Sequence, residues 1–396
     1  MTKHLEELAS QATRQYISQH RNDDINSLAL KAAPYDVDRH FALQQIEAMQ
    51  KLKHKVPSWA DNPDLFFPPR LSIEQCSSEL TAVYKAQLVE GHTLADLSGG
   101  MGIDCYFMSQ KFGETDYVEM DPDLCAIAKH NFAALNANIK VINSKSDIYL
   151  KDCNPKDCFF IDPARRDSHG RKVVLLSDCE PDIRPMIGAA LAKAPRLLIK
   201  LSPMLDITAA LKEIPHVANV HVVAVGNECK ELLIDVAREH SGWPRFVCCN
   251  LSTSQPTVTF DTGDEANAPL TLANEVESYL YEPNAAIMKS GFFKAIAARY
   301  GIAELHVSSH LYTSPRLIGD FPGRIFAVEQ CLPFSKKSIK AIKEELSQAN
   351  ISTRNFPMTV AELRKALSLS EGGDTYLFAT TLKNGDKAII RCRKAL

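Results

Sequence analysis

The sequence predicts an α/β fold in which a mostly parallel sheet ends in an antiparallel hairpin. A helical region precedes this sheet and a small α+β module follows it. Short apolar runs alternate with helical patterns between residues 90 and 250, which is typical of a parallel sheet covered on both faces. The runs at 221–225 and 231–235 are too close for a helical crossover, so we expect them to pair as the hairpin. Residues 1–88 show no strand alternation, which favours helices there.

The chain has 396 residues, which is too long for one core, so more than one domain is expected. Changes of pattern along the chain delimit the regions. They are a helical region at 1–88, the sheet domain at 89–255, a short segment at 270–321 and a C-terminal domain at 322–396. A polar linker at 261–269 precedes the third region.

The first region is expected to enter the sheet domain through a helix. Leu5, Leu8, Ala12 and Tyr16 recur near helical spacing. Residues 57–69 hold four prolines and predict an irregular connection, and a helix over 71–85 follows. The strands expected next are 93–97, 116–120, 140–143, 157–161, 196–201, 221–225 and 231–235.

The segments beyond residue 255 are predicted to mix helices with short strands. Asn384-Gly385 between alternating apolar runs is a strong hairpin signal for 376–382 and 387–392. The other expected elements are helices at 292–300, 335–349 and 359–367 and strands near 305–307 and 324–328.

Composition excludes several classes of protein. The chain has no apolar run near the ~20 residues that cross a bilayer, and its first 20 residues are polar, so neither a membrane protein nor a secretory signal is expected. Its 11 cysteines include no C-x-x-C pair, and several stand in apolar runs (Cys105, Cys125, Cys158 and Cys248). This pattern indicates buried thiols in a cytoplasmic protein and no metal site.

Charge is spread unevenly along the chain. Residues 322–396 hold 13 Lys and Arg against 7 Asp and Glu, whereas the whole chain carries a formal charge of −3. A basic module on an acidic body is expected to meet an anionic partner, unless the asymmetry is only a solvated surface.

The turn after the first expected strand carries three glycines. Gly99, Gly100 and Gly102 lie between Asp96 and Asp104. Glycines let the backbone turn sharply and approach a ligand closely, and the helix beyond offers free N–H groups. Two other interpretations stay open. One is a nucleotide phosphate loop, although its G-K-[ST] ending is absent, and the other is a glycine turn that only packs a helix on a strand.

Polar residues follow the next strands at their carboxyl ends, which form the usual ligand rim of open α/β sheets. Glu119 ends the second strand, where a carboxylate accepts hydrogen bonds from both ribose hydroxyls, and Asp121 is its near rival. Ser146 and Asp147 follow the third strand and suit either an adenine amino group or a helix cap. Asp162-Pro-Ala-Arg165 follows the fourth strand.

Together these motifs resemble those of class I S-adenosylmethionine-dependent methyltransferases, whose sheet is Rossmann-like. The resemblance implies S-adenosylmethionine as the cofactor. The cofactor contacts that it implies are Asp96, Ser98, Gly99, Gly100, Gly102, Asp104, Glu119, Met120, Asp147 and Asp162. One departure is Ser98, where these enzymes usually have glycine, and Gly99 and Gly100 are expected to compensate by shifting the turn.

The whole chain further resembles a bacterial methyltransferase family with a small ferredoxin-like segment and a C-terminal THUMP-like domain. The matching stretches are 74–79, 162–166, 201–206, 281–285, 309–313 and 355–357. The resemblance implies that 89–255 is the methyltransferase domain, 270–321 the ferredoxin-like segment and 322–396 the THUMP-like domain. Because THUMP domains bind RNA, it also implies RNA as the substrate, tRNA included.

Asp162 to Arg165 indicates the type of reaction. Enzymes that methylate carbon 5 of pyrimidines need a thiolate nucleophile after the fifth strand, but residues 200–205 include no cysteine. We therefore expect transfer to a nitrogen or oxygen, with Asp162 and Arg165 as catalytic residues. Asp162 would orient the acceptor and take its proton, while Arg165 or Arg166 would anchor a phosphate. Lys200 is a further candidate for substrate binding. The alternative role of the arginines is a salt bridge with Asp167, Asp178 or Glu180.

Other interpretations of single residues and of the whole chain remain. Cys179 fits a buried thiol better than a nucleophile. His306 and His310 stand four apart but not on one helix face, so no metal is expected there. The chain would alternatively be a small-molecule or protein methyltransferase whose C-terminal module only mediates assembly, or a non-catalytic RNA-binding protein. The oligomeric state is left open by the sequence.

Overall fold

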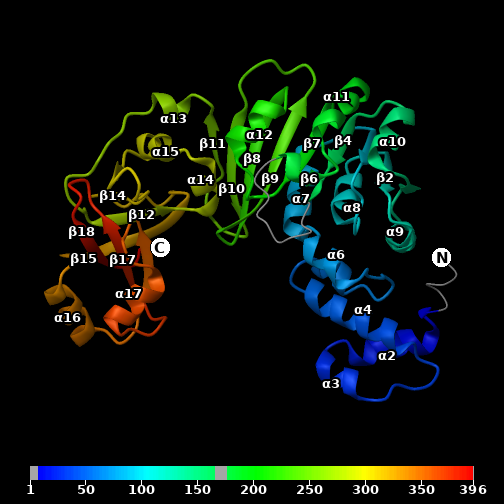
Figure 1. Cartoon of the computed structure of the whole chain (residues 1–396), viewed down its shortest axis with the longest axis horizontal. Coiled ribbons are helices and arrows are strands. Elements are labelled where there is room, and N and C mark those ends of the chain that lie inside the picture. The colour runs from blue at the N-terminus through cyan, green and yellow to red at the C-terminus, as the bar shows by residue number, and fades with distance from the viewer. Residues whose placement is uncertain (1–7, 166–175, 396) are drawn as a thin grey trace. The chain divides into compact units, whose positions relative to one another are not determined.

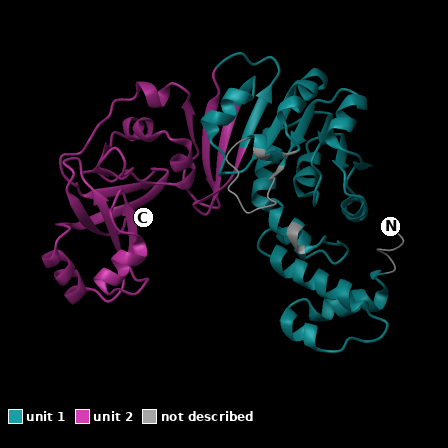
Figure 2. Ribbon diagram, in the orientation of Figure 1, with its two compact units in different colours: residues 1–218, 233–242 teal, residues 219–232, 243–396 magenta. Residues whose placement is uncertain are grey.

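The computed structural model describes residues 8–165 and 176–395, apart from the side chains of residues 70, 71, 164, 165, 178 and 180 (Figure 1). The expected roles of Arg166 and of the acid at 167 therefore lie outside the described residues. The chain divides into two compact units (Figure 2). Unit 1 comprises residues 1–218 and 233–242, and unit 2 comprises 219–232 and 243–396.

Unit 1 begins with short helices, as the sequence predicts. They are α2 (Gln11–His20), α3 (Ile25–Leu30), α4 (Arg39–Leu52), α5 (Pro57–Ala60), α6 (Arg70–Gln75) and α7 (Glu79–Leu88). The side chains of Ser10, Asp24 and Asp38 cap α2, α3 and α4 by accepting backbone N–H groups. The expected single helix over 71–85 is wrong. It is broken into α6 and α7 because Ser78, in extended backbone, caps α7 through the N–H of Thr81.

The central sheet has the strand order β11-β10-β8-β9-β7-β4-β1-β2-β3. Strands β3, β2, β1, β4 and β7 pair in parallel. Their bounds are β1 Thr93–Asp96, β2 Glu114–Glu119, β3 Ile139–Asn143, β4 Cys158–Ile161 and β7 Arg196–Leu201. Successive residues of β4 are all buried, so both faces of the sheet are covered, as the alternating pattern predicts.

The helices of this sheet follow its strands. They are α8 (Ile103–Ser109), α9 (Pro122–Ala134), α10 (Ser146–Asp152), α11 (Arg184–Lys193) and α12 (Ile207–Glu213). Ile103 of α8 and Phe132 of α9 pack with Ala82 of α7 and Tyr117 of β2 in one buried apolar cluster. This cluster holds the first turn of α8 against the end of β2, which is where the glycine turn lies.

The predicted hairpin is formed by β8 (Val217–Val225) and β9 (Glu228–Ala237). Its turn, Gly226-Asn227, has positive φ at both residues, as tight hairpin turns require. Two strands that the sequence did not predict extend the sheet. Strand β10 (Arg245–Leu251) pairs in parallel with β8, and β11 (Val258–Asp261) pairs antiparallel with β10. The expected linker at 261–269 contains the short helix α13 (Asp264–Asn267).

The rest of unit 2 is built on a seven-stranded sheet of order β13-β14-β12-β15-β18-β17-β16. The strands are β12 Tyr279–Pro283, β13 Ala303–Glu304, β14 Tyr312–Ser314, β15 Gly323–Pro333, β16 Asn350–Arg354, β17 Thr375–Thr381 and β18 Lys387–Lys394. The helices are α14 Ala285–Ser290, α15 Phe293–Tyr300, α16 Lys336–Glu345 and α17 Val360–Leu367. Leu280, Phe326, Phe378 and Ile390 lie in one of its apolar cores.

The predictions for unit 2 succeeded where local signals were strong. Strands β17 and β18 pair antiparallel, and Gly385 has φ +89°, which confirms the Asn-Gly hairpin. The strand expected near 305–307 is displaced, since the short strand β13 ends at Glu304, directly before these residues. These residues form a turn, closed by the bond from Ser309 N to His306 O at 2.9 Å. The helix expected to reach residue 349 ends at Glu345, and β16 follows it.

A small antiparallel ladder follows β4, made of β5 (Ala164–Arg165) and β6 (Cys179–Glu180). Cys179 is buried, which agrees with a buried thiol. Cys105, Cys125, Cys158 and Cys248 are buried as well, as expected. Across residues 8–165 and 176–395, every helix is too short or too polar to cross a lipid bilayer.

Candidate functional site

The turn between β1 and α8 needs its glycines for shape and for space. Gly100 and Gly102 have φ of +54° and +83°, a region that side chains rarely adopt. A Cβ on Gly99 would lie 2.4 Å from the ring of Tyr117, so only glycine fits there. The Tyr117 hydroxyl donates to the carbonyl oxygen of Gly100 at 2.6 Å. These contacts hold the turn against β2 and fix the conformation of its backbone.

Glu119, at the end of β2, ties this turn to the next strand. Its Oε2 accepts the N–H of Gly100 at 2.8 Å, and its Oε1 accepts the N–H of Asp121 at 2.9 Å. A carboxylate has about four lone-pair sites, so both oxygens can still accept hydroxyl groups. The rival, Asp121, caps α9 instead by accepting the N–H of Asp123 at 2.8 Å.

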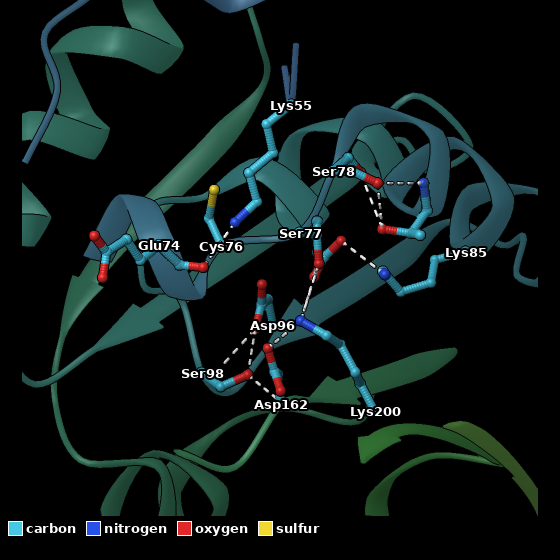
Figure 3. Close-up of polar contacts among 12 residues, drawn as sticks. Lys55, Glu74, Cys76, Ser77, Ser78, Lys85, Asp96, Ser98, Asp162 and Lys200 are labelled. Atoms are coloured by element: carbon cyan, nitrogen blue, oxygen red, sulfur yellow. Dashed lines mark hydrogen bonds and ion pairs between the residues drawn. The ribbon is translucent and has the colours of Figure 1, made fainter. Parts of the chain in front are cut away.

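Ser98 joins the ends of β1 and β4. Its backbone N–H and its hydroxyl both donate to Oδ1 of Asp96, at 2.9 and 3.1 Å. The same hydroxyl oxygen accepts the N–H of Asp162 at 2.7 Å (Figure 3). A glycine at position 98 would provide neither side-chain contact, so this departure from the usual motif has a structural role.

Asp96 is a carboxyl group held in an unfavourable environment. Burial raises its pKa to about 7, against the lowering effect of the Ser98 hydrogen bonds, and the nearby Asp104 and Asp162 raise it further. The group therefore changes its charge close to neutral pH in the ligand-free protein.

Asp104 stands at the start of α8, among cations. Lys85 of α7, which is fully buried, lies 3.2 Å from Oδ1, and the hydroxyl of Ser77 donates to Oδ2 at 2.6 Å. Burial raises the pKa of Asp104, but Lys85 and Lys200 outweigh it and the pKa is lowered. The contacts of this carboxylate are those of a support for the site, and its predicted contact with the cofactor stays a prediction.

Lys200, at the end of β7, connects Asp104 to Asp162. Its Nζ lies 2.5 Å from Oδ2 of Asp162, 2.9 Å from the hydroxyl of Ser77 and 3.6 Å from Oδ2 of Asp104 (Figure 3). The contacts to Asp162 and Ser77 are hydrogen bonds, whereas the contact to Asp104 is a longer ion pair. The Lys200 side chain is 12% exposed and that of Asp162 is 34% exposed, so Asp162 is the member that meets solvent.

Two of the expected cofactor contacts, Met120 and Asp147, lie at the surface. Met120 is 69% exposed, and Asp147 is exposed at the start of α10. The alternative role of Ser146 and Asp147 as a helix cap is wrong, because α10 has no side-chain cap and the Ser146 hydroxyl donates to the Leu97 carbonyl. Ile148 is 49% exposed, an unusual position for a large apolar residue.

The backbone of Arg165 lies in β5, but its side chain falls outside the described part of the chain, as do Arg166 and the proposed salt-bridge partners Asp178 and Glu180. In the described ranges, no group of three or more His, Cys, Asp or Glu side chains is arranged to hold a metal ion.

The sequence did not predict the contacts of Ser77 and Lys85 or the exposure of Ile148. Ser77 and Lys85 precede the glycine turn, in a stretch that looks like an ordinary helix. A lysine at an inward position of an amphipathic helix was the only available signal for Lys85. Ile148 directly follows the predicted Asp147, so an apolar residue beside the expected adenine contact was its signal.

Comparison with known proteins finds methyltransferases that are similar to this chain in sequence and fold. A crystal structure of a candidate methyltransferase from Porphyromonas gingivalis W83 is 33% identical, covers 99% of both chains and has a TM-score of 0.89. An uncharacterised S-adenosylmethionine-dependent methyltransferase of Mycobacterium tuberculosis is 21% identical over 75% of this chain and 80% of its own. Family models match residues 279–322 as a ferredoxin-like domain and residues 323–394 as THUMP domain-like.

The fold and the strand-end site define an S-adenosylmethionine-dependent methyltransferase of class I. Within that class, the chain belongs to the family represented by the Porphyromonas protein, in which ferredoxin-like and THUMP-like domains accompany the methyltransferase fold.

Proposed function

We propose that this protein transfers the methyl group of S-adenosylmethionine to a nitrogen or oxygen atom of RNA, tRNA included. One observation carries the proposal. The glycine turn with Glu119 and the Asp162–Lys200 pair stand at the carboxyl ends of neighbouring strands β2, β1, β4 and β7. That rim is where open α/β sheets bind ligands.

The cofactor would lie along this rim. Glu119 would accept the two ribose hydroxyls, and the backbone of Gly99 and Gly100 would lie close to the ligand because no Cβ intervenes. Met120 and Ile148, both exposed, would cover the faces of the adenine. Asp147 would accept a hydrogen bond from the adenine amino group. Asp96 would face the cationic end of the cofactor, which favours the ionised carboxylate.

The acceptor would be oriented by Asp162. Lys200 occupies Oδ2 of this carboxylate, so Oδ1 is the oxygen suited to hold the acceptor N–H or O–H. When bound, S-adenosylmethionine supplies an electrophilic methyl group on a sulfonium. Asp162 would align the acceptor with that methyl and take up its proton, while Lys200, held by Ser77 and Asp104, fixes the carboxylate in one rotamer.

RNA is favoured as the substrate by the C-terminal part of the chain. Residues 323–394 match a THUMP-like family model, and residues 322–396 carry an excess of six positive charges (13 − 7). A basic module attracts a polyanion from solution.

The test is transfer of labelled methyl groups into RNA isolated from a strain that lacks this protein. Asp162→Ala should bind S-adenosylhomocysteine within about threefold of the parent yet lose at least ~100-fold in turnover. Glu119→Ala should lose ~100-fold or more in cofactor affinity, because two charge-assisted hydrogen bonds disappear. Glu114→Ala, at the exposed opposite end of β2, is the matched control and should behave like the parent.

Full turnover by Asp162→Ala would disprove its catalytic role. Label that enters protein or a small metabolite, and not RNA, would instead support the alternative substrates. Absence of any affinity for S-adenosylhomocysteine, measured by calorimetry, would contradict methyl transfer altogether.

A further inference from the structure

Unit 2 contains a pair of arginines that share one buried carboxylate. Glu282 of β12 is 3% exposed. Arg324 of β15 donates from Nε to Oε2 of Glu282 at 2.6 Å, and Arg354 of β16 donates from Nη2 to Oε1 at 3.0 Å. Each oxygen of a single acid therefore holds one guanidinium group.

The charges of this cluster do not cancel. Two guanidinium groups face one carboxylate, which leaves an excess of one positive charge. Both arginine side chains are 36% exposed. Among the described residues, neither arginine forms a salt bridge with a second acid. A guanidinium has five N–H donors, and the contacts to Glu282 use two of Arg324 and one of Arg354. The remaining donors form no ion pair with any other acid in the described part of the chain.

Three motifs that the methyltransferase site does not use meet around this cluster. Glu282 belongs to the stretch 281–285, and Arg354 precedes the stretch 355–357. The carbonyl oxygen of Asn355 accepts the hydroxyl of Thr381. The backbone carbonyl of that threonine accepts the hydroxyl of Ser309, the first residue of the stretch 309–313, at 3.0 Å.

The local backbone also favours a polar surface beside Arg354. Asn355 is exposed and has φ +50°, a left-handed conformation that few residues other than glycine adopt. Its side-chain nitrogen lies 3.1 Å from Nδ1 of His306. Arg354, Asn355 and His306 thus present hydrogen-bonding groups from two segments that are far apart in the chain.

We propose that Arg324 and Arg354 form a phosphate-binding site that holds the backbone of the RNA substrate. Planar guanidinium groups fit phosphate oxygens in pairs, and orientation by Glu282 lowers the entropy lost on binding. An acidic peptide would also suit arginines, but the excess of positive charge over residues 322–396 favours a polyanion. The inference rests on the proposed function for the identity of the polymer.

The experiment measures RNA binding by the full-length protein as a function of salt. The probe is the unmodified RNA used for methyl transfer, labelled with a fluorophore. Arg354→Gln should bind it about tenfold more weakly near 0.1 M salt, and the slope of log K against log salt should fall by about 0.7–0.9, the value for one phosphate contact. Arg354→Lys keeps the charge but loses the planar guanidinium group. Its affinity for the RNA should lie between those of Arg354→Gln and the parent.

Arg393→Gln is the matched control. Its side chain is 62% exposed and pairs with Glu329 in the same domain, so affinity and slope should stay at the parental values. Affinity for S-adenosylhomocysteine and the thermal midpoint report whether each variant is folded.

Each outcome decides something. Equal losses in Arg354→Gln and Arg393→Gln would indicate general electrostatics and overturn the site. If Arg354→Gln lowered the thermal midpoint but left RNA affinity and its salt dependence unchanged, the arginines would only hold the strands together. Competition by an acidic peptide but not by inorganic phosphate would assign the site to a protein partner and overturn the proposal. If the parent protein had no affinity for RNA, the proposed substrate and this site would both be contradicted. If the parent methylated RNA but Arg354→Gln left the slope of log K against log salt unchanged, this site alone would be contradicted.

Discussion

At the scale of single residues, the site is governed by burial of charge. Asp96 and Asp104 are both buried, yet their environments act in opposite directions. Asp96 accepts hydrogen bonds from the amide and hydroxyl of Ser98, and burial raises its pKa to about 7. Asp104 has two lysines, and its pKa is lowered. These two carboxylates, one at the end of β1 and the other in the first turn of α8, thus favour different protonation states.

The Asp96 environment predicts a pH dependence of cofactor binding. A cationic ligand stabilises the ionised carboxylate, so binding below pH 7 must release a proton. Affinity for S-adenosylmethionine, whose sulfonium carries the positive charge, should fall as the pH drops from 8 to 6, by up to about tenfold per unit once the pH is below 7. Calorimetry in buffers of different ionisation enthalpy measures the released proton. Asp96→Asn should show neither the release nor the slope, and an unchanged proton count in that variant would refute the assignment.

The same pKa has a consequence for stability with a definite sign. The folded-state pKa of about 7 lies above the ordinary value of 3.8, so ionised Asp96 opposes folding. This penalty is fully present above pH 7 and is relieved as the pH falls below it. In urea unfolding, the difference in stability between Asp96→Asn and the parent should therefore shrink from pH 8 to pH 6.

The buried pair of Lys85 and Asp104 predicts a large effect on stability. Lys85 is fully buried, so Lys85→Met leaves Asp104 with less compensation for its lost hydration. The free energy of unfolding should fall by about 3–5 kcal/mol, measured by urea denaturation. The double variant Lys85→Met/Asp104→Asn should recover part of this loss, because the buried carboxylate charge that Lys200 alone compensates less well is gone. A double variant less stable than the single one would argue against the ion pair.

At the scale of secondary-structure elements, the β1–α8 turn is the most constrained connection of unit 1. It combines positive φ at Gly100 and Gly102 with the contact of Gly99 against Tyr117. Glu119 closes it from β2 through the N–H of Gly100. The turn therefore couples the shape of the ligand rim to the pairing of two strands.

Gly102→Ala is predicted to damage both stability and binding. A Cβ there would lie 2.7 Å from the ring of Phe132, and φ of +83° disfavours any side chain. Strain and overpacking together should cost about 2–4 kcal/mol in thermal unfolding, with weaker binding of S-adenosylhomocysteine. Gly188→Ala is the control, since Gly188 lies within α11 with nothing near its Cβ position. It should be neutral or stabilising by up to ~1 kcal/mol, and similar losses in both variants would contradict this account.

At the scale of the whole molecule, the two units carry different kinds of chemistry. The strand-end residues of the candidate cofactor site belong to unit 1, whereas the basic module belongs to unit 2. Cofactor binding would depend on short hydrogen bonds and buried charges, and RNA binding on many exposed cations. The two should therefore respond differently to salt.

Raising salt from 0.05 to 0.2 M should separate the two binding events. The apparent KM for RNA should rise at least ~10-fold, because released counterions oppose binding, while the Kd for S-adenosylhomocysteine should change by less than about twofold. Steady-state methyl transfer and calorimetry provide the two numbers. A KM that is insensitive to salt would be incompatible with a phosphate-dominated contact.

The sequence predicted the parts of this protein that depend on local pattern. The parallel strands, the β8–β9 hairpin and the Asn384-Gly385 turn follow from periodicity and turn chemistry, which act over a few residues. The break between α6 and α7 was missed because serine is compatible with the interior of a helix, and the capping hydrogen bond of Ser78 is evident only in the structure. Strands β10 and β11 were missed because their pairing partners, not their own residues, define them.

By itself, the sequence determined which residue types stand at the strand ends, and hence the class of cofactor that they suit. Only the tertiary structure decided which of them touch. Lys200 is 38 residues from Asp162 and 123 from Ser77, yet its ammonium group contacts both. The physical reason is that strand-end positions are set by local propensity, whereas the pairing of charges depends on how separate strands and helices pack. Burial then sets the strength of each contact, and a linear sequence does not carry that quantity.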